Sequence, residues 1–176
     1  MQETVKQDRD KYIGGSDIPV IMNLSPFKSR FDLLLEKAGY KKDAFEGNIY
    51  TEYGNTMEPF IRDWINLNMI SPRKFKEGKH IRDAENGEII GVRIHTDGEN
   101  NNSILEIKTT SQIYDKVEDY KLYLVQLLFY MVNTGKPYGL LAVYERPEDL
   151  SEEFESRRLQ LFDIKLEDYT ELCEEI

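Results

Sequence analysis

Cysteine is almost absent from this sequence, because its 176 residues include a single one, Cys173. One cysteine excludes an intrachain disulfide, a four-cysteine zinc site and an iron–sulfur cluster, and it fits a reducing compartment. Long apolar stretches are also missing: the longest, residues 122–132, is interrupted by Gln126 and is too short to span a bilayer. The N-terminal residues are polar and of mixed charge, unlike a signal peptide. We therefore expect a soluble cytoplasmic protein without a membrane partner.

Positive charge is in short supply, since 23 Lys and Arg stand against 33 Asp and Glu, for a net charge of −10. A protein that coats nucleic acid is expected to be basic, so this balance argues against such a partner. The excess acid is local, however. Residues 145–176 carry 12 acidic and 4 basic side chains, which leaves residues 1–144 with a net charge of −2. The overall charge is therefore a weak argument, and it mainly predicts which end of the chain DNA avoids.

The length and the 40% of hydrophobic residues suit one domain with a sizeable core. Helical periodicity is found in residues 18–23, 29–39, 50–69 and 120–134. Strand patterns are found in residues 88–96, 103–109, 138–144 and 159–164. This order of helices and strands predicts an α/β or α+β domain with a mixed central sheet. We divide it into a helical segment (1–45), a core (46–144) and an acidic C-terminal strand and tail (145–176).

Two of these expectations concern local detail. In the helix of residues 29–39 the apolar face is predicted to consist of Phe31, Leu34, Leu35 and Ala38. A hairpin loop is predicted over residues 97–102, between two strands.

A candidate site lies on the strand of residues 103–109. Because strand side chains alternate, Glu106 and Lys108 share one face, while the apolar side chains of Leu105 and Ile107 share the other. The hairpin brings Asp97 towards Glu106. Two carboxylates and a backbone carbonyl, such as that of Ile107, would hold one Mg²⁺. Lys108 would then help to deprotonate or orient a water beside the metal and stabilise charge on a phosphate.

Each part of this pattern has a simpler interpretation. An acidic residue two before a lysine also occurs at Glu77, Asp119 and Asp163, and the alternative for Glu106 is a surface ion pair. Gln126 is the only strongly polar residue of its apolar stretch and lies four residues before Tyr130, on the same helix face; it could be a satisfied core amide. Glu58 lies beside the apolar stripe of the helix of residues 50–69, where most glutamates are solvated.

Several short segments in a fixed order carry a family resemblance. They are Arg9, Gly14-Gly15-Ser16-Asp17, Leu24-Ser25-Pro26-Phe27-Lys28, the segment 34–39, Gly54 to Pro59 with Glu58, Asp97-Gly98, Leu105-Glu106-Ile107-Lys108, and the helix with Gln126. Together they resemble the YqaJ-type viral recombinase family, which includes the phage lambda-type exonucleases and belongs to the PD-(D/E)XK nuclease superfamily. The proline that names the superfamily is replaced here by Thr96.

The resemblance implies a restriction-endonuclease-like core and a role for each matching residue. Asp97 and Glu106 resemble the metal-binding carboxylates, Lys108 the catalytic lysine, and Glu58 the helix carboxylate of a second metal position. Gln126 resembles a glutamine that contacts the active-site phosphate or water. Arg9 and Ser16, in the helical segment, resemble a pair that holds a DNA 5′-phosphate. Ser16 opens a predicted helix, whose free N–H groups favour an anion, although an ordinary N-cap explains the same residues.

The expected function follows from the resemblance: a Mg²⁺-dependent deoxyribonuclease, with Mn²⁺ as a substitute, that degrades duplex DNA ends from 5′ to 3′. It would make single strands for phage recombination in the cytoplasm of a bacterial or phage-infected cell. A single-strand annealing protein and a homotrimer are the implied partners. The alternatives are a structure-specific or restriction-type endonuclease, and a non-catalytic protein that mimics DNA or binds its ends.

Overall fold

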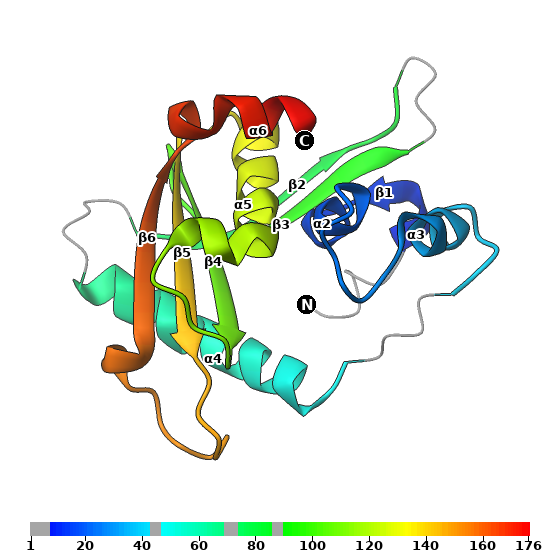
Figure 1. Ribbon diagram of the computed structural model, residues 1–176. Helices are drawn as coiled ribbons and strands as arrows, with labels where there is room; N and C mark the ends of the chain where they lie inside the picture. Colours follow the sequence, from blue (N-terminus) through cyan, green and yellow to red (C-terminus); the bar gives the residue numbers. More distant parts are fainter. Residues whose placement is uncertain (1–7, 43–46, 69–73, 86–89) are drawn as a thin grey trace.

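A mixed six-stranded sheet forms the centre of the computed structural model, which describes residues 8–42, 47–68, 74–85 and 90–176 (Figure 1). Its strands are β1 (Tyr12–Ile13), β2 (Lys76–Arg82), β3 (Gly91–Glu99), β4 (Ser103–Thr110), β5 (Tyr138–Glu145) and β6 (Leu159–Lys165). The order is β1-β3-β4-β5-β6, and β2 pairs with β3. The β1–β3 and β4–β5 pairs are parallel, and the others are antiparallel. The predicted α/β class with a mixed sheet is confirmed.

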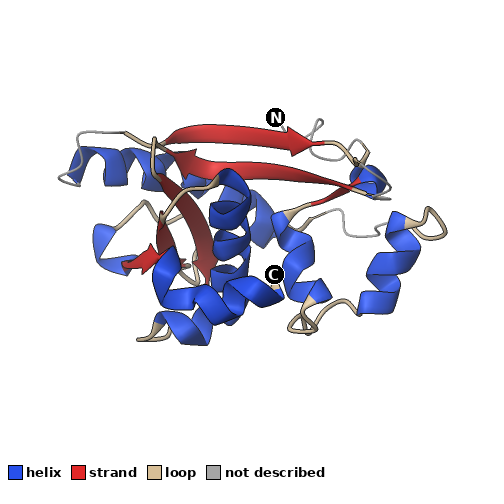
Figure 2. Cartoon of the chain, turned by 90° about the horizontal axis from the view of Figure 1, so that it is seen from above, coloured by secondary structure: helices blue, strands red, loops and turns tan. Residues whose placement is uncertain are grey.

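Helices cover the sheet, and residues 8–42 form an N-terminal lobe beside it (Figure 1). The helices are α2 (Ile18–Ile21), α3 (Arg30–Lys37), α4 (Ile49–Asn68), α5 (Lys121–Thr134) and α6 (Thr170–Glu175). Short 3₁₀ turns are η1 (Arg9–Lys11), η2 (Gly15–Asp17), η3 (Val117–Tyr120), η4 (Ser156–Arg158) and η5 (Leu166–Tyr169). Seen from above, β2 and β3 form a long arm that extends towards the N-terminal helices (Figure 2). No helix of the described residues is long and apolar enough to cross a membrane.

The core has two halves, one on each face of β4 and β5. On one face, the buried side chains of α5 pack with Ile104 and Leu141. On the other face, α4 packs with Leu105 and Leu140. Neighbouring residues of each strand thus enter opposite halves, as the period of two requires. Because helices bury both faces of these central strands, a charged side chain on them lies in a largely dry environment.

The predicted helix ends are largely confirmed. The α5 helix ends at Gly135, whose φ of 66° is the left-handed C-cap conformation that glycine adopts easily. The Ser29 hydroxyl accepts a hydrogen bond from the Asp32 N–H and caps α3. The end predicted at residue 69 lies outside the described residues, as do residues 88 and 89 of a predicted strand.

The predicted apolar face of α3 is wrong. Phe31 and Leu34 are 66% and 61% exposed and Ala38 is exposed, whereas Leu33 is buried. The reason is that α3 packs on η1 and donates hydrogen bonds from Lys37 to the carbonyls of Arg9 in η1 and Tyr12 in β1. The orientation of the helix is therefore set by polar contacts, which cannot be predicted from the spacing of its apolar residues.

The predicted loop at residues 97–102 begins too early, because β3 continues to Glu99 and includes Asp97. The Asn100 side chain closes the turn by accepting hydrogen bonds from the N–H groups of Asn102 and Ser103. A second difference is β2, which the strand patterns did not predict; it is antiparallel to β3. The short β1 and the C-terminal α6 were not predicted.

Candidate active site

Asp97 lies where β3 and β4 separate. The ladder pairs Gly98 with Leu105, so the next position sets Asp97 opposite Glu106. There the Asp97 carboxylate, at Oδ2, accepts a hydrogen bond of 2.7 Å from the Ile107 N–H. A side chain thus takes the place of a backbone acceptor, which fixes this carboxylate beside Glu106.

Glu106 and Lys108 point to the same side of β4 and form an ion pair. Lys108 Nζ lies 2.6 Å from Glu106 Oε1. The Glu106 side chain is 2% exposed, and its Oε2 has no hydrogen-bond partner among the described residues. A buried carboxylate oxygen without a partner is costly, so its presence calls for an explanation.

Glu58 reaches this group from α4 and is held by Arg62, one helical turn later. Arg62 Nη1 lies 2.9 Å from Glu58 Oε1 and donates a hydrogen bond of 2.6 Å to the Asp97 carbonyl. Its Nη2 also pairs with Glu77 of β2 at 2.8 Å. Arg62 thus connects three elements at the site. The sequence signal for it was the spacing of four residues from Glu58, which is typical of a helix ion pair.

The helix α4 approaches β4 closely at Gly54. A Cβ atom there would lie 3.1 Å from the Thr109 hydroxyl oxygen, tighter than most contacts. The absence of a side chain at this position therefore lets α4 bring Glu58 near the strand carboxylates.

The three carboxylates raise one another's pKa values. Burial, and then the charge of Glu106, raises the pKa of Asp97 from 3.8 to about 7. Burial also raises the pKa of Glu106, and burial with the Asp97 charge raises that of Glu58. For Lys108, burial opposes the charge, but Glu106 and Asp97 outweigh it and raise the pKa further. Lys108 is therefore a protonated donor at neutral pH, suited to stabilising charge rather than to removing a proton.

The helix α5 turns Tyr123, Gln126 and Tyr130 towards these charges. Gln126 Nε2 donates a hydrogen bond of 2.9 Å to the Tyr130 hydroxyl, which joins the pair predicted from their spacing. Lys108 Nζ lies 5.9 Å from the centre of the Tyr123 ring. Burial, and then the charge of Glu106, raises the pKa of Tyr130 well above its ordinary value. Tyr123 was not predicted, although it precedes Gln126 by three residues and so shares its face.

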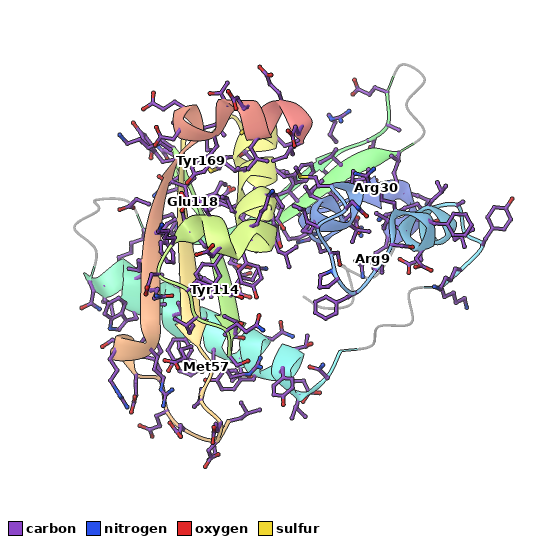
Figure 3. All side chains as sticks on the ribbon, in the orientation of Figure 1. Arg9, Arg30, Met57, Tyr114, Glu118 and Tyr169 are labelled. Atoms are coloured by element: carbon purple, nitrogen blue, oxygen red, sulfur yellow. The ribbon has the colours of Figure 1, made fainter. Side chains whose placement is uncertain are left out.

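Arg9 lies in the N-terminal lobe, apart from Met57 of α4 in the view of Figure 3. Ser16 is exposed and belongs to η2 rather than to the start of a helix. The helix that follows, α2, has only four residues, so the argument from a helix N-terminus does not hold. The site assigned to these two residues remains a prediction.

Lys37 of α3 holds this lobe together. Its Nζ lies 2.7 Å from the Asp17 carboxylate, at Oδ2, and donates to the carbonyls of Arg9 at 2.8 Å and Tyr12 at 2.7 Å. The same Asp17 oxygen accepts from the Gly14 N–H at 3.0 Å. Asp17 is buried, so this cluster is a compact, fully used polar network inside the lobe. One lysine therefore fixes the backbone on both sides of the segment from Arg9 to Ser16.

The carboxylates suit a hard divalent cation. Among the described residues, no group of three or more His, Cys, Asp or Glu side chains meets closely enough to hold a metal by itself. One oxygen of each carboxylate is already bound to a protein group: that of Glu58 to Arg62, that of Glu106 to Lys108, and that of Asp97 to the Ile107 N–H. The unpartnered Glu106 Oε2 and the mutual repulsion of the carboxylates nevertheless favour a cation, and an all-oxygen donor set is the kind that Mg²⁺ prefers.

An open cleft of about 490 Å³ leads to this site. Its lining includes Glu58, Asp97, Ile107 and Lys108. The cleft is also lined by Tyr50 and Arg146, and by neutral polar side chains that include Thr51, Asn55 and Thr109. The charged group is therefore accessible from outside, although Glu106 itself is buried.

Without added metal, the protein should lose stability as the pH rises. A carboxyl whose pKa is higher in the folded chain binds its proton preferentially there. For Asp97 the stability therefore falls between about pH 4 and pH 7, and the full cost, on the order of 4 kcal/mol, remains above this range. We expect the denaturation midpoint in EDTA to be lower at pH 8 than at pH 5.5.

The variant Asp97→Asn isolates this effect, because its amide oxygen can still accept from the Ile107 N–H. Its midpoint should change less with pH and exceed that of the wild type at pH 8. Mg²⁺ should raise the wild-type midpoint at pH 8 but not that of Asp97→Asn. Parallel pH profiles for the two proteins would contradict the assigned repulsion.

Comparisons with known proteins agree with this architecture. The chain is similar to an alkaline exonuclease of Laribacter hongkongensis, with 17% identity, a TM-score of 0.63 and coverage of 98% of this chain and 87% of that one. It is equally similar to a phage-related exonuclease of Haemophilus somnus 129PT, with 17% identity, a TM-score of 0.63 and coverage of 93% and 89%. At this identity the likeness shows a shared fold, here one found in nucleases.

A comparison with curated protein sequences found no significant match. The family profile of the YqaJ-like viral recombinase domain, by contrast, matches residues 5–137. This match covers most of the chain, including β3, β4 and α5 with the charged residues that they position. The chain therefore belongs to the family of YqaJ-like viral recombinase domains.

Proposed function

We propose that this protein is a Mg²⁺-dependent deoxyribonuclease, and more narrowly an exonuclease that degrades one strand of duplex DNA from its 5′ end. The observation that carries the proposal is the group of Asp97, Lys108 and the buried Glu106 at an open cleft, with one carboxylate oxygen of Glu106 left without a partner among the described residues. The family and the exonuclease structures of the same fold support the substrate class.

The residues of the site divide the work. Asp97 and Glu106 would hold the metal with the Ile107 carbonyl, and Glu58 would complete a second position. Bound Mg²⁺ supplies charge neutralisation at the attacked phosphate and lowers the pKa of a water. Lys108 stays protonated and donates to a phosphate oxygen, where it stabilises the charge that develops. Gln126, oriented by Tyr130, contacts the phosphate or the attacking water.

The preference for a 5′ end is assigned to the N-terminal lobe. We place the terminal phosphate at Arg9 and Ser16, in the segment that Lys37 holds. The product strand would serve a single-strand annealing partner, in the cytoplasm of a bacterial or phage-infected cell. The family also suggests a homotrimer. The charge distribution suggests that the acidic side chains of residues 145–176 are turned away from DNA.

A DNA mimic is disfavoured by the position of the charges. Such a protein needs carboxylates spread over its surface, whereas Glu106 is buried and paired with Lys108. The endonuclease alternative shares the same site chemistry, and the form of the DNA substrate separates it from an exonuclease.

Linear and circular forms of one plasmid, each incubated with the protein in Mg²⁺ or EDTA, test the proposal. We expect rapid loss of the linear duplex in Mg²⁺, no cleavage of the closed circle, and no reaction in EDTA. Mononucleotide release from a labelled 5′ strand should exceed release from the 3′ strand at least tenfold. Cutting of the circle at a similar rate would establish an endonuclease, and absence of cleavage in any condition would overturn the enzyme.

A further inference from the structure

Arg146 lines the active-site cleft beside Tyr50, which precedes Glu58 by eight residues of α4, about 12 Å along the helix. Tyr50 lies at the start of α4, and Arg146 follows β5 directly. Its guanidinium lies over the Tyr50 ring, with the central carbon 3.9 Å from the ring centre. Among the described residues no carboxylate forms an ion pair with it. An arginine in this position keeps a charge available for a ligand that enters the cleft.

The backbone of Arg146 is fixed on the sheet. Its N–H donates a hydrogen bond of 2.8 Å to the Thr110 carbonyl, which continues the pairing of β4 and β5 by one residue. The next residue, Pro147, is buried. The side chain therefore starts from a rigid point at the end of β5, beside β4, the strand that carries Lys108.

Tyr50 is fixed as well. The Asn48 side chain accepts hydrogen bonds from the N–H groups of Tyr50, at 3.0 Å, and of Thr51, at 3.1 Å, and so caps the first turn of α4. The ring thus projects from a fixed backbone position, and the guanidinium lies over it. Stacking leaves the N–H groups at the guanidinium edge free to donate in the plane, which is the geometry that binds a phosphate with two hydrogen bonds.

The charges of the cleft make such a contact useful. Its lining includes Glu58 and Asp97, which repel a polyanion until a cation neutralises them. A cleft of this volume holds about one small ligand, so about one nucleotide fits between the carboxylates and Arg146. The polar groups of its lining, at Thr51, Asn55 and Thr109, can bond to sugar or phosphate oxygens.

We propose that Arg146, supported by Tyr50, binds a non-scissile phosphate of the strand that is being cut, about one nucleotide from the site of hydrolysis. This inference rests on the proposed nuclease function and names a contact within it. Arg146 holds the strand in register with the carboxylates in the ground state and in the transition state alike. Its contribution is therefore to binding rather than to the chemical step.

The variants Arg146→Ala and Arg146→Lys, with Arg157→Ala as the control, test this role. Arg157 is an exposed arginine outside the cleft that pairs with Glu155, so its loss changes the net charge equally. We expect Arg146→Ala to raise KM about tenfold, the effect of one lost charge-assisted contact, with kcat changed less than threefold. The KM of Arg146→Lys should lie between those of the wild type and Arg146→Ala, because lysine keeps the charge but lacks the planar guanidinium.

Duplex binding in EDTA, followed by fluorescence anisotropy, gives a readout without cleavage. Arg146→Ala should reduce the slope of log affinity against log salt by about one, and Arg157→Ala should leave it unchanged. Tyr50→Ala should weaken binding about threefold, while Tyr50→Phe, which keeps the ring, should not. Circular dichroism and thermal melts verify that each variant is folded.

Single neutral methylphosphonate linkages, placed one at a time along the 5′ strand, identify the phosphate. At one position the neutral linkage should weaken wild-type binding about tenfold but leave Arg146→Ala binding unchanged. If the loss of binding from the neutral linkage and the loss from Arg146→Ala are additive at every linkage position, the proposal is wrong. It is also wrong if Arg146→Ala has the same KM and the same salt slope as the wild type. A wild type that binds but never cleaves DNA would overturn the nuclease function and leave this contact standing, whereas a wild type that binds no DNA would overturn both.

Discussion

Replacement of Glu106 by Gln should reduce DNA hydrolysis in Mg²⁺ by at least about a thousandfold and leave the fold intact, because it removes a metal-binding charge from a preorganised site. The amide oxygen can still accept from Lys108 Nζ, so the packing of β4 is unchanged. The free energy of unfolding should change by less than about 1 kcal/mol, or increase, since a neutral amide is buried at lower cost than a carboxylate with an unpartnered oxygen. Single-turnover rates and urea denaturation measure the two effects.

Lys108→Met should reduce the rate about a hundredfold or more, but at a different structural cost. It leaves the buried Glu106 carboxylate without its counterion, which should lower the free energy of unfolding by about 3 kcal/mol. The double variant with Glu106→Gln should recover the stability without the activity. The matched control is Lys165→Ala, from the Asp163-Ile164-Lys165 sequence of β6. A loss of activity in Lys165→Ala as large as that in Lys108→Met would contradict the assignment of the site.

Replacement of Lys37 by Met should destabilise the protein by about 3–5 kcal/mol, the usual effect of removing one partner from a buried ion pair. The Asp17 carboxylate would remain buried without its counterion, and the carbonyls of Arg9 and Tyr12 would lose their donor. The segment that bears Ser16 should then show faster amide hydrogen exchange. If this segment binds the DNA end, the preference for a 5′-phosphate over a 5′-hydroxyl end should fall in parallel.

The control for Lys37 lies in the same lobe. Lys41 pairs with Asp32 at 2.8 Å, but the two side chains are 47% and 39% exposed. Lys41→Met should therefore cost less than about 1 kcal/mol and leave end preference unchanged. The double variant Asp17→Asn with Lys37→Met should recover part of the stability. Equal effects of Lys37→Met and Lys41→Met would show that the buried network is not what holds the lobe.

Local patterns predicted those parts of the fold that local chemistry determines. The period of two in β4, the apolar length of α5 and the glycine at residue 135 each act within a few residues of their position, and all three are confirmed. The orientation of α3 was not predictable in this way. Its buried face is selected by the contacts of Lys37 with Arg9 and Tyr12, more than twenty residues earlier, and these outweigh its apolar spacing.

The candidate site shows the same division. Glu106 and Lys108 share a strand, so their common face followed from spacing, and Asp97 followed from the hairpin. Arg62 and Arg146 depend on distant partners. Arg62 joins α4 to β2 and β3, and Arg146 meets Tyr50 from the opposite end of the chain. Sequence periodicity does not predict such pairs, because their members come together only when the sheet has formed.

The contact between Gly15 and Tyr130 limits how this sequence can diverge. A Cβ atom at residue 15 would overlap the Tyr130 ring and hydroxyl, and the ring is buried and bonded to Gln126. Space for alanine at residue 15 would require a smaller side chain at residue 130, and that substitution would remove the partner of Gln126. The side chains that these two positions can hold therefore depend on each other, although more than a hundred residues separate them. Through this pair, the residue type allowed at position 15 of the N-terminal lobe depends on Tyr130 of α5, the helix that faces the carboxylates.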